Sequence, residues 1–216
     1  MLNWGVIGCG GIAYRRTIPE GILRAKNARL LAVMDADKNK AKEVGEKFGV
    51  RYYSNIEDIL RDGDIQVVYI ATPVYLHKEQ IIHSAMAGKH ILSEKPLALK
   101  SGEAGEIIDV CKREGVKLGV GYMMRFHSLH EKAKEMIGND ELGKIVFARA
   151  QLSCWYPPIP GAWRQDSALG GGGALIDMGI HSLDLLEYIT GSEIEEVACF
   201  TDNVIHSYKS EDSSLV

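Results

Sequence analysis

The first 120 residues alternate between short apolar runs and longer amphipathic stretches, an order that few folds accommodate. The apolar runs are rich in β-branched residues and predict buried parallel strands at 4–7, 30–34, 67–70, 90–92 and 116–120. The stretches between them have helical spacing, at 12–25, 38–48, 56–61, 76–87 and 101–114. Gly49, Gly63, Gly88 and Gly115 fall where those helices should end. Regular strand–helix alternation predicts an α/β fold with a doubly wound parallel sheet.

The pattern changes after Gly121, where we place a domain boundary that gives domains at 1–121 and 122–216. The second part predicts helices at 126–137 and 174–190, with a loop rich in Pro, Gly and Trp at 154–173. It also predicts long strands at 144–153 and 195–203, and a third strand that begins at 213. Strands without short helical crossovers between them indicate an α+β domain with an open, mostly antiparallel sheet.

Composition excludes several classes of function. The formal net charge of −4 gives no basic surface for a nucleic acid. No apolar run approaches the ~20 residues that a membrane span needs. The four cysteines form no CxxC pair, which argues against a zinc site or a disulfide framework and favours a reducing, cytoplasmic location. We therefore expect no metal, no nucleic-acid partner and no membrane.

A glycine-rich turn lies between the first strand and the first helix. Its sequence, Gly8-Cys9-Gly10-Gly11-Ile12-Ala13, matches the G-x-G-x-x-[GA] pattern of dinucleotide-binding Rossmann domains. Gly8 permits the tight turn, Gly10 lets the backbone approach a pyrophosphate, and the helix N-terminus attracts phosphate. We predict cofactor contacts from Gly8, Gly10, Gly11, Ile12 and Asp35, which ends the second strand. The alternative is a structural turn with a surface Asp.

Asp35 also bears on the choice of cofactor. Its carboxylate would accept hydrogen bonds from the adenosine ribose and would repel a 2′-phosphate. Ala36 and Asp37 supply no cation, although Arg15, Arg16, Lys38 and Lys40 are near in sequence. NAD is therefore the predicted cofactor, with NADP as the alternative.

Polar residues follow two more strands at the edge where such sheets bind ligands. Ala71, Thr72 and Pro73 end one strand, and His77 follows at a helix start, where it is either near the cofactor or a plain helix-terminal residue. Glu94, Lys95 and Pro96 end the next strand. Glu94 and Lys95 could form a surface ion pair of little energetic value. Lys95 beside a nicotinamide could instead stabilise negative charge on a substrate oxygen.

A helix in the second domain carries ionisable residues at regular spacing. Asp177, His181 and Asp184 stand at i, i+4 and i+7 after the four glycines 170–173, and on an α-helix they share a face. A carboxylate one turn from a histidine can orient it and raise its basicity, which suits a general base. The alternative is a solvated polar face that carries one histidine.

Taken together, these motifs resemble those of the glucose–fructose oxidoreductase and inositol dehydrogenase (Gfo/Idh/MocA) family over nearly the whole chain. The resemblance is carried by the glycine turn, Ala71–Pro73 with His77, Glu94–Pro96, Gly121-Tyr122 leading to Arg125-Phe126, Trp163-Arg164, and the segment from Gly171 to Asp184. It implies NAD(P)-dependent oxidation of a sugar or cyclitol hydroxyl, or the reverse reduction.

The resemblance also implies roles for single residues. Lys95 would contact substrate and nicotinamide, and His181, beside Asp177 in the substrate pocket, would take the hydroxyl proton. The cofactor's nicotinamide half would lie near Ala71, Thr72, Pro73, His77 and Glu94. Substrate oxygens would be held by Arg125 and Arg164. Met123-Met124 stands where relatives often carry more polar residues, which leaves the identity of the substrate open.

Family members usually continue past this length and complete a broad sheet that mediates oligomer contacts. The sequence stops at Val216 as a strand begins, so we expect a truncated product or fragment of a protein that is a homo-oligomer in its full-length form. Two alternatives to a sugar oxidoreductase stay open: a reductase of a non-sugar carbonyl or imine on the same scaffold, and a cofactor-bound sensor or assembly protein without turnover.

Overall fold

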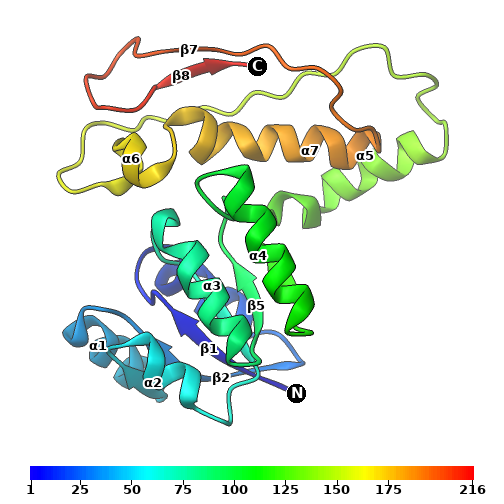
Figure 1. The fold of residues 1–216 in the computed structure, drawn as a ribbon. Coiled ribbons are helices and arrows are strands. Elements are labelled where there is room, and N and C mark those ends of the chain that lie inside the picture. Colours follow the sequence, from blue (N-terminus) through cyan, green and yellow to red (C-terminus); the bar gives the residue numbers. More distant parts are fainter. The chain divides into compact units, whose positions relative to one another are not determined.

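A computed structural model describes residues 1–216, which form two compact units, Met1–Gly121 and Tyr122–Val216 (Figure 1). The first unit contains one sheet of six strands in the order β3-β2-β1-β4-β5-β6, all paired in parallel. The strands are β1 (Leu2–Ile7), β2 (Ala28–Met34), β3 (Arg51–Tyr53), β4 (Val67–Ile70), β5 (His90–Ser93) and β6 (Leu118–Val120). This order is that of a doubly wound dinucleotide-binding sheet, so the predicted fold class is confirmed.

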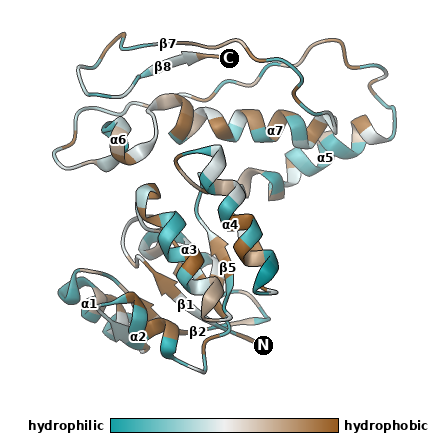
Figure 2. Cartoon of the chain, viewed as in Figure 1, coloured by the Kyte–Doolittle hydropathy of each residue, from teal (hydrophilic) through white to brown (hydrophobic).

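Helices cover both faces of this sheet and bury an apolar layer on each. They are η1 (Ala13–Ile22), α1 (Lys38–Phe48), α2 (Ile56–Arg61), η2 (Val74–Leu76), α3 (His77–Met86) and α4 (Ser101–Arg113). One core joins the sheet to η1 and α1, and the other joins it to α2, α3 and α4. In Figure 2 strands such as β1 and β5 are mainly hydrophobic, whereas the covering helices carry both hydrophobic and hydrophilic residues. This difference between strands and helices is the sequence pattern that predicted the fold.

The ends of these helices follow their local sequence. Asp37 caps α1, because its side chain accepts hydrogen bonds from the backbone N–H groups of Asn39 and Lys40. Gly49, Gly88 and Gly115 have φ of +66°, +71° and +68°, as expected of left-handed C-caps. The fourth predicted cap, Gly63, does not have a positive φ, so it is not a left-handed C-cap.

The helix after the glycine turn is a π-helix rather than an α-helix. Pro19 lies inside η1 and has no N–H to donate to the residue four positions earlier. Leu23 N–H donates to Ile18 O at 3.1 Å, five residues back. The wider turn keeps the helix continuous across the proline.

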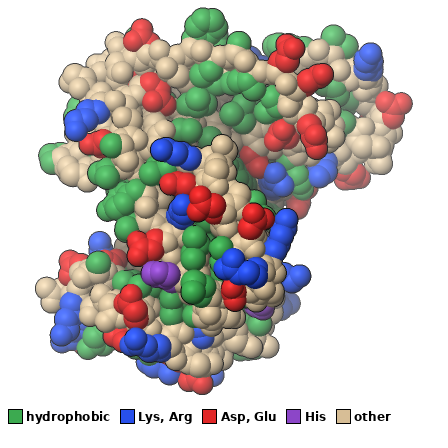
Figure 3. Space-filling model, in the orientation of Figure 1, with side chains coloured by type: hydrophobic (Ala, Val, Ile, Leu, Met, Phe, Trp, Pro, Cys, Tyr) green, Lys and Arg blue, Asp and Glu red, His purple; other side chains and the backbone are tan.

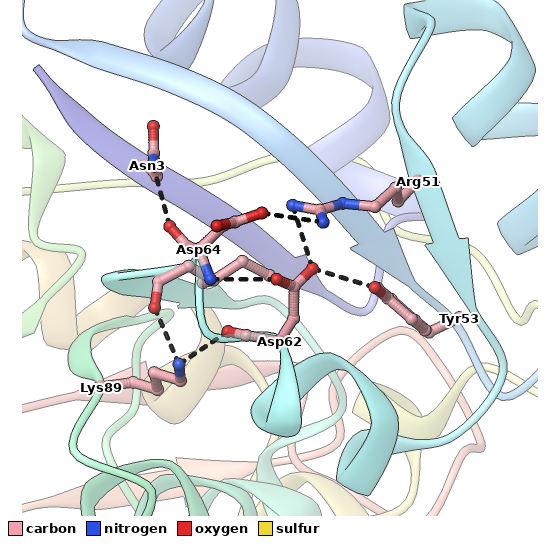
Figure 4. A network of polar contacts seen from close by, with 7 residues as sticks. Asn3, Arg51, Tyr53, Asp62, Asp64 and Lys89 are labelled. Atoms are coloured by element: carbon pink, nitrogen blue, oxygen red, sulfur yellow. Dashed lines mark hydrogen bonds and ion pairs between the residues drawn. The ribbon is translucent and has the colours of Figure 1, made fainter.

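The edge strand β3, which the sequence pattern did not predict, is held by a polar network (Figure 4). Arg51 contacts both Asp62 and Asp64 at 3.1 Å, and Tyr53 Oη donates to Asp62 Oδ2 at 2.9 Å. The buried Lys89 Nζ donates to the carbonyl oxygens of Asp62 and Ile65 at 2.9 and 2.8 Å. The network ties β3 to the turn between α2 and β4.

The regular structure of the second unit consists of helical segments and two short strands. Its elements are η3 (Met123–Phe126), α5 (Ser128–Gly138), η4 (Trp163–Gln165), α6 (Ser167–Gly170), η5 (Leu175–Gly179), α7 (Ile180–Thr190), β7 (Phe200–Asp202) and β8 (Ser213–Leu215). Strands β7 and β8 pair antiparallel, which is the direction predicted. The helix predicted at 174–190 is divided into the π turn η5 and the α-helix α7.

Of the two long strands predicted in this unit, one is not formed and the other is formed only in part. Residues 144–153 contain no strand, and of residues 195–203 only β7 is paired. Apolar side chains in these segments lie at the surface, including Phe147 and Phe200, which are 81% and 72% exposed. Figure 3 shows hydrophobic side chains on the surface of the face that it draws. Alternation shows that a segment has an apolar face, but a strand forms only when a neighbouring strand supplies hydrogen-bond partners.

Candidate active site

The turn after β1 can be built only with glycine at its first position. Gly8 has φ of +81°, and its N–H donates to Met34 O at 2.9 Å. A Cβ on this residue would lie 2.7 Å from Thr72 Cγ2 and 2.9 Å from Thr72 N. The turn is therefore packed against Thr72, two residues after the end of β4. Gly8 therefore provides the tight turn that opens the dinucleotide-binding motif.

A small hollow of about 180 Å³ opens beside the same turn. It is lined by Cys9, Gly10, Gly11, Tyr14, Arg15, Lys40, Glu43 and Val44. A Cβ on Gly10 would lie 2.8 Å from Lys40 Nζ, the mobile end of a long side chain, and Gly11 has φ of +48°. Ile12 is partly exposed at the start of the helix. Glycines, a helix N-terminus and an ammonium group together fit a diphosphate.

Asp35 directly follows β2 and is held in place by its neighbours. Its Oδ1 accepts a hydrogen bond from Asp37 N–H at 3.1 Å, and its Oδ2 lies 3.8 Å from Cys9 Sγ. Cys9 is fully buried, and burial, followed by the charge of Asp35, raises the pKa of its thiol to about 12. The carboxylate is thus held beside the glycine turn.

The side chain of His77 connects the residues after β4 to those after β5 through hydrogen bonds. The His77 side chain is buried, with Nδ1 2.9 Å from Pro96 O and Nε2 2.9 Å from Thr72 O. Burial lowers the pKa of His77, while the two carbonyl oxygens act in the opposite direction. Ala71 N–H donates to Ile7 O at 2.9 Å, which continues the pairing of β4 with β1. His77 therefore joins the two segments that are predicted to contact the cofactor.

Glu94, Lys95 and Pro96 directly follow β5, and the Lys95–Pro96 peptide bond is cis. Glu94 N–H donates to Ile70 O at 2.8 Å. Its carboxylate accepts a hydrogen bond from the hydroxyl of Tyr69, which the sequence analysis did not identify. The predicted cofactor residues of this unit thus share the carboxyl edge of β1, β2, β4 and β5, where doubly wound sheets bind ligands.

In the second unit, Arg125 and Asp184 form an ion pair that lies near the side chains of Tyr188 and Tyr122. Arg125 donates to both oxygens of Asp184 and lies 5.2 Å from the ring centre of Tyr188. Tyr122 lies edge-on to His181, with ring centres 6.1 Å apart. Burial and then the charge of Asp184 raise the pKa of Tyr122. His181 is 6% exposed and lies at the start of α7.

Arg164 and Asp177 form a separate ion pair on the same unit. Arg164 Nε lies 3.2 Å from Asp177 Oδ1. Both residues line a hollow of about 650 Å³, together with residues of 147–156 and 205–216, and neither His181 nor Arg125 lines it. The π turn η5 contains Asp177, so the α-helical spacing on which the predicted shared face rested applies only to His181 and Asp184.

The four-glycine loop packs against Glu211 and donates hydrogen bonds to it. The sequence analysis did not identify this residue. Glu211 Oε1 accepts hydrogen bonds from Gly173 N–H and Leu175 N–H at 2.8 and 3.0 Å, and Ala174 N–H donates to Glu211 O at 2.9 Å. A Cβ on Gly173 would lie 1.9 Å from that carbonyl oxygen. Glu211 therefore satisfies the free N–H groups of the turn that carries Asp177.

Comparison with known proteins agrees with this architecture. Residues 2–122 match the family described as an oxidoreductase family with an NAD-binding Rossmann fold (GFO_IDH_MocA), and residues 130–216 match the GFO/IDH/MocA C-terminal domain. None of the helices is both long enough and apolar enough to cross a membrane.

Three relatives illustrate the similarity. The 1,5-anhydro-D-fructose reductase of Ensifer adhaerens is 28% identical over 202 residues, which cover 93% of this chain and 60% of that protein. The crystal structure of aldose–aldose oxidoreductase from Caulobacter crescentus, complexed with glycerol, is 32% identical with a TM-score of 0.79, covering 94% of this chain and 62% of that one. A 3-ketoreductase from Actinomadura kijaniata, in complex with NADP and TDP-benzene, is 29% identical with a TM-score of 0.81, covering 93% and 61%.

The chain spans about 60% of the length of the reductase from Ensifer adhaerens. Both of its units nevertheless match the corresponding domains of one family, and the first unit has that family's dinucleotide-binding fold. The protein belongs to the Gfo/Idh/MocA family of NAD(P)-binding oxidoreductases.

Proposed function

We propose that the protein transfers a hydride between NAD and a secondary hydroxyl or carbonyl carbon of a sugar or cyclitol. The observation that carries this proposal is the shared edge of the parallel sheet, where the glycine turn, Asp35, residues 71–73 and residues 94–96 follow four strands. Names of the relatives point to sugar substrates, namely an anhydrofructose reductase and an aldose–aldose oxidoreductase. The substrate class is therefore proposed by similarity, and the cofactor class by geometry and similarity together.

The cofactor is proposed to lie across the glycine turn. Gly8, Gly10, Gly11 and Ile12 would contact the pyrophosphate, and Asp35 would accept hydrogen bonds from the adenosine ribose. We propose NAD rather than NADP because Asp35 Oδ1 and Oδ2 are fixed beside the turn. Lys40 and Arg15 line the adjacent hollow, so they are the cations that would favour NADP if the preference were reversed.

The second domain is proposed to hold the substrate and move its proton. When bound, the nicotinamide supplies hydride acceptance or donation. His181, oriented by Asp177, would remove the proton from the substrate hydroxyl. Lys95 would stabilise the changing charge on the same oxygen, and Arg125 and Arg164 would bind other substrate oxygens. This scheme requires Lys95 and His181 to reach one substrate molecule.

A panel of polyols and aldoses, assayed for NADH formation, tests the proposed activity. The same assay with Lys95→Met and His181→Asn tests the assigned roles. Each variant is expected to lose about 100-fold or more in turnover while its affinity for NADH is unchanged. Lys112→Met and His83→Asn are matched controls, because both side chains are exposed on helices α4 and α3. Full activity of both Lys95→Met and His181→Asn would contradict the mechanism.

A further inference from the structure

One buried hydroxyl group lies between the helix of the glycine turn and the segment 94–96. Tyr69, on strand β4, is 1% exposed and is among the largest fully buried side chains. Its Oη donates a hydrogen bond to Glu94 Oε1 at 2.5 Å and accepts one from Thr17 Oγ1 at 3.0 Å. The three side chains form a continuous chain of hydrogen bonds that ends on a carboxylate.

The two ends of this chain belong to the two halves of the proposed cofactor site. Thr17 lies on η1, which begins directly after the glycine turn. Glu94 directly precedes Lys95 at the end of β5. The Glu94 carboxylate is also packed against Gly121, where a Cβ would lie 3.5 Å from Glu94 Oε1. Tyr69 therefore connects the pyrophosphate-binding element to a residue expected near the nicotinamide.

Packing alone does not require a hydroxyl at this position. Phenylalanine would fill the same core space, and a buried hydroxyl is costly unless it is hydrogen-bonded. A hydrogen bond to a carboxylate is about twice as strong as one between neutral groups. Burial, and then the charge of Glu94, raise the pKa of Tyr69, so its hydroxyl stays protonated and remains a donor.

We propose that Tyr69 is a positioning residue for the cofactor, which acts by fixing the orientation of the Glu94 carboxylate toward the nicotinamide half. Thr17 supports it by orienting the Tyr69 hydroxyl. The inference rests on the proposed function, because it assumes that a nicotinamide dinucleotide binds along this edge. It predicts that loss of the Tyr69 hydroxyl weakens binding of the nicotinamide half only.

Isothermal titration of the whole chain with NADH and with ADP-ribose tests this assignment, since ADP-ribose lacks the nicotinamide. For Tyr69→Phe, the dissociation constant of NADH is expected to rise about tenfold while that of ADP-ribose is unchanged. Thr17→Val is expected to raise the ratio of the NADH dissociation constant to the ADP-ribose dissociation constant by a smaller factor. Tyr53→Phe is the matched control, because it removes a hydroxyl bound to the carboxylate of Asp62 on the edge strand β3. Its ratio should equal that of the wild type.

A double-mutant cycle shows whether Tyr69 acts through Glu94. In a Glu94→Ala background, Tyr69→Phe is expected to cause no further loss of NADH affinity. An equal loss of affinity for NADH and ADP-ribose, an unchanged ratio, or a full effect in the Glu94→Ala background would each overturn the positioning role alone. Failure of the wild-type protein to bind either ligand would overturn the proposed function together with this inference.

Discussion

Arg125 donates three hydrogen bonds to Asp184: Nε to both carboxylate oxygens, at 3.0 and 2.9 Å, and Nη2 to Oδ1 at 2.5 Å. The Asp184 side chain is 10% exposed. The pair joins η3 to α7, the helix that carries His181. These hydrogen bonds fix the orientation of the guanidinium and therefore the direction of its remaining N–H groups. Arg125 is also a proposed substrate contact, so the pair would position those groups for the substrate.

Removing this arginine should destabilise the second unit. In Arg125→Met, Asp184 is left as a mostly buried carboxylate without its guanidinium, which we expect to lower the free energy of unfolding by about 1–3 kcal/mol. Urea unfolding measures the change. Arg113→Met is the control, since its pair with Glu114 is exposed and should contribute well under about 1 kcal/mol. Equal losses in the two variants would contradict the structural role of the pair.

Gly173 should tolerate no side chain. In Gly173→Ala, the new Cβ would meet backbone atoms of Glu211, which cannot move without breaking the hydrogen bonds that cap the η5 turn. We expect a loss of about 1–3 kcal/mol, measured by thermal or urea unfolding. Gly102→Ala is the matched control, because its Cβ would enter open space on α4 and should stabilise that helix. A stable Gly173→Ala variant would show that the loop is not packed as described.

His77 should make stability depend on pH below neutrality. Burial lowers its pKa from the ordinary value of 6.5. Below pH 6.5 the unfolded chain therefore binds a proton that the folded chain does not, and the free energy of unfolding falls as the pH falls. The slope is at most about 1.4 kcal/mol per pH unit for one proton.

Urea unfolding of the wild type and of His77→Gln at a series of pH values measures this effect. The variant also loses hydrogen bonds, but that loss lowers its free energy of unfolding by the same amount at every pH. The difference between the two proteins should shrink as the pH falls below 6.5. A difference that is constant with pH would mean that His77 does not titrate abnormally.

Asp35 should set the cofactor preference. The wild type is expected to bind NADH more tightly than NADPH, because the fixed carboxylate repels a 2′-phosphate. Asp35→Ser should reduce that preference by about tenfold and leave Lys40 and Arg15 free to attract the phosphate. Titration with both reduced cofactors measures the ratio. Tighter binding of NADPH by the wild type would reverse the assignment.

The parallel sheet was predictable because its strands are buried on both faces, which leaves short apolar runs between amphipathic helices. Strand β3 escaped prediction because it has three residues at the sheet edge and depends on Arg51 and Tyr53 contacts with distant Asp62. The strand expected at 144–153 was wrong, and the one expected at 195–203 was right only at β7, for the opposite reason. Their alternation is clear, but pairing is a property of neighbours and not of the segment itself.

The candidate site was predictable where motif and strand end coincide, as at Gly8, Asp35 and Glu94. Residues that act through distant contacts carry no such signal. Tyr69 reads as one more apolar residue in a buried run, and its hydrogen bonds to Thr17 and Glu94 span 52 and 25 residues of sequence. Glu211 caps a turn that begins 38 residues earlier. No local spacing rule could have paired them.

The buried thiol in the glycine turn has a practical consequence. Alkylating and oxidising reagents attack the thiolate, and with a pKa near 12 the sulfur of Cys9 stays protonated at neutral pH and is shielded from solvent. Cys154 and Cys199 are exposed. A maleimide dye added to the folded protein should therefore attach at Cys154 and Cys199 and leave the cysteine of the dinucleotide turn unmodified.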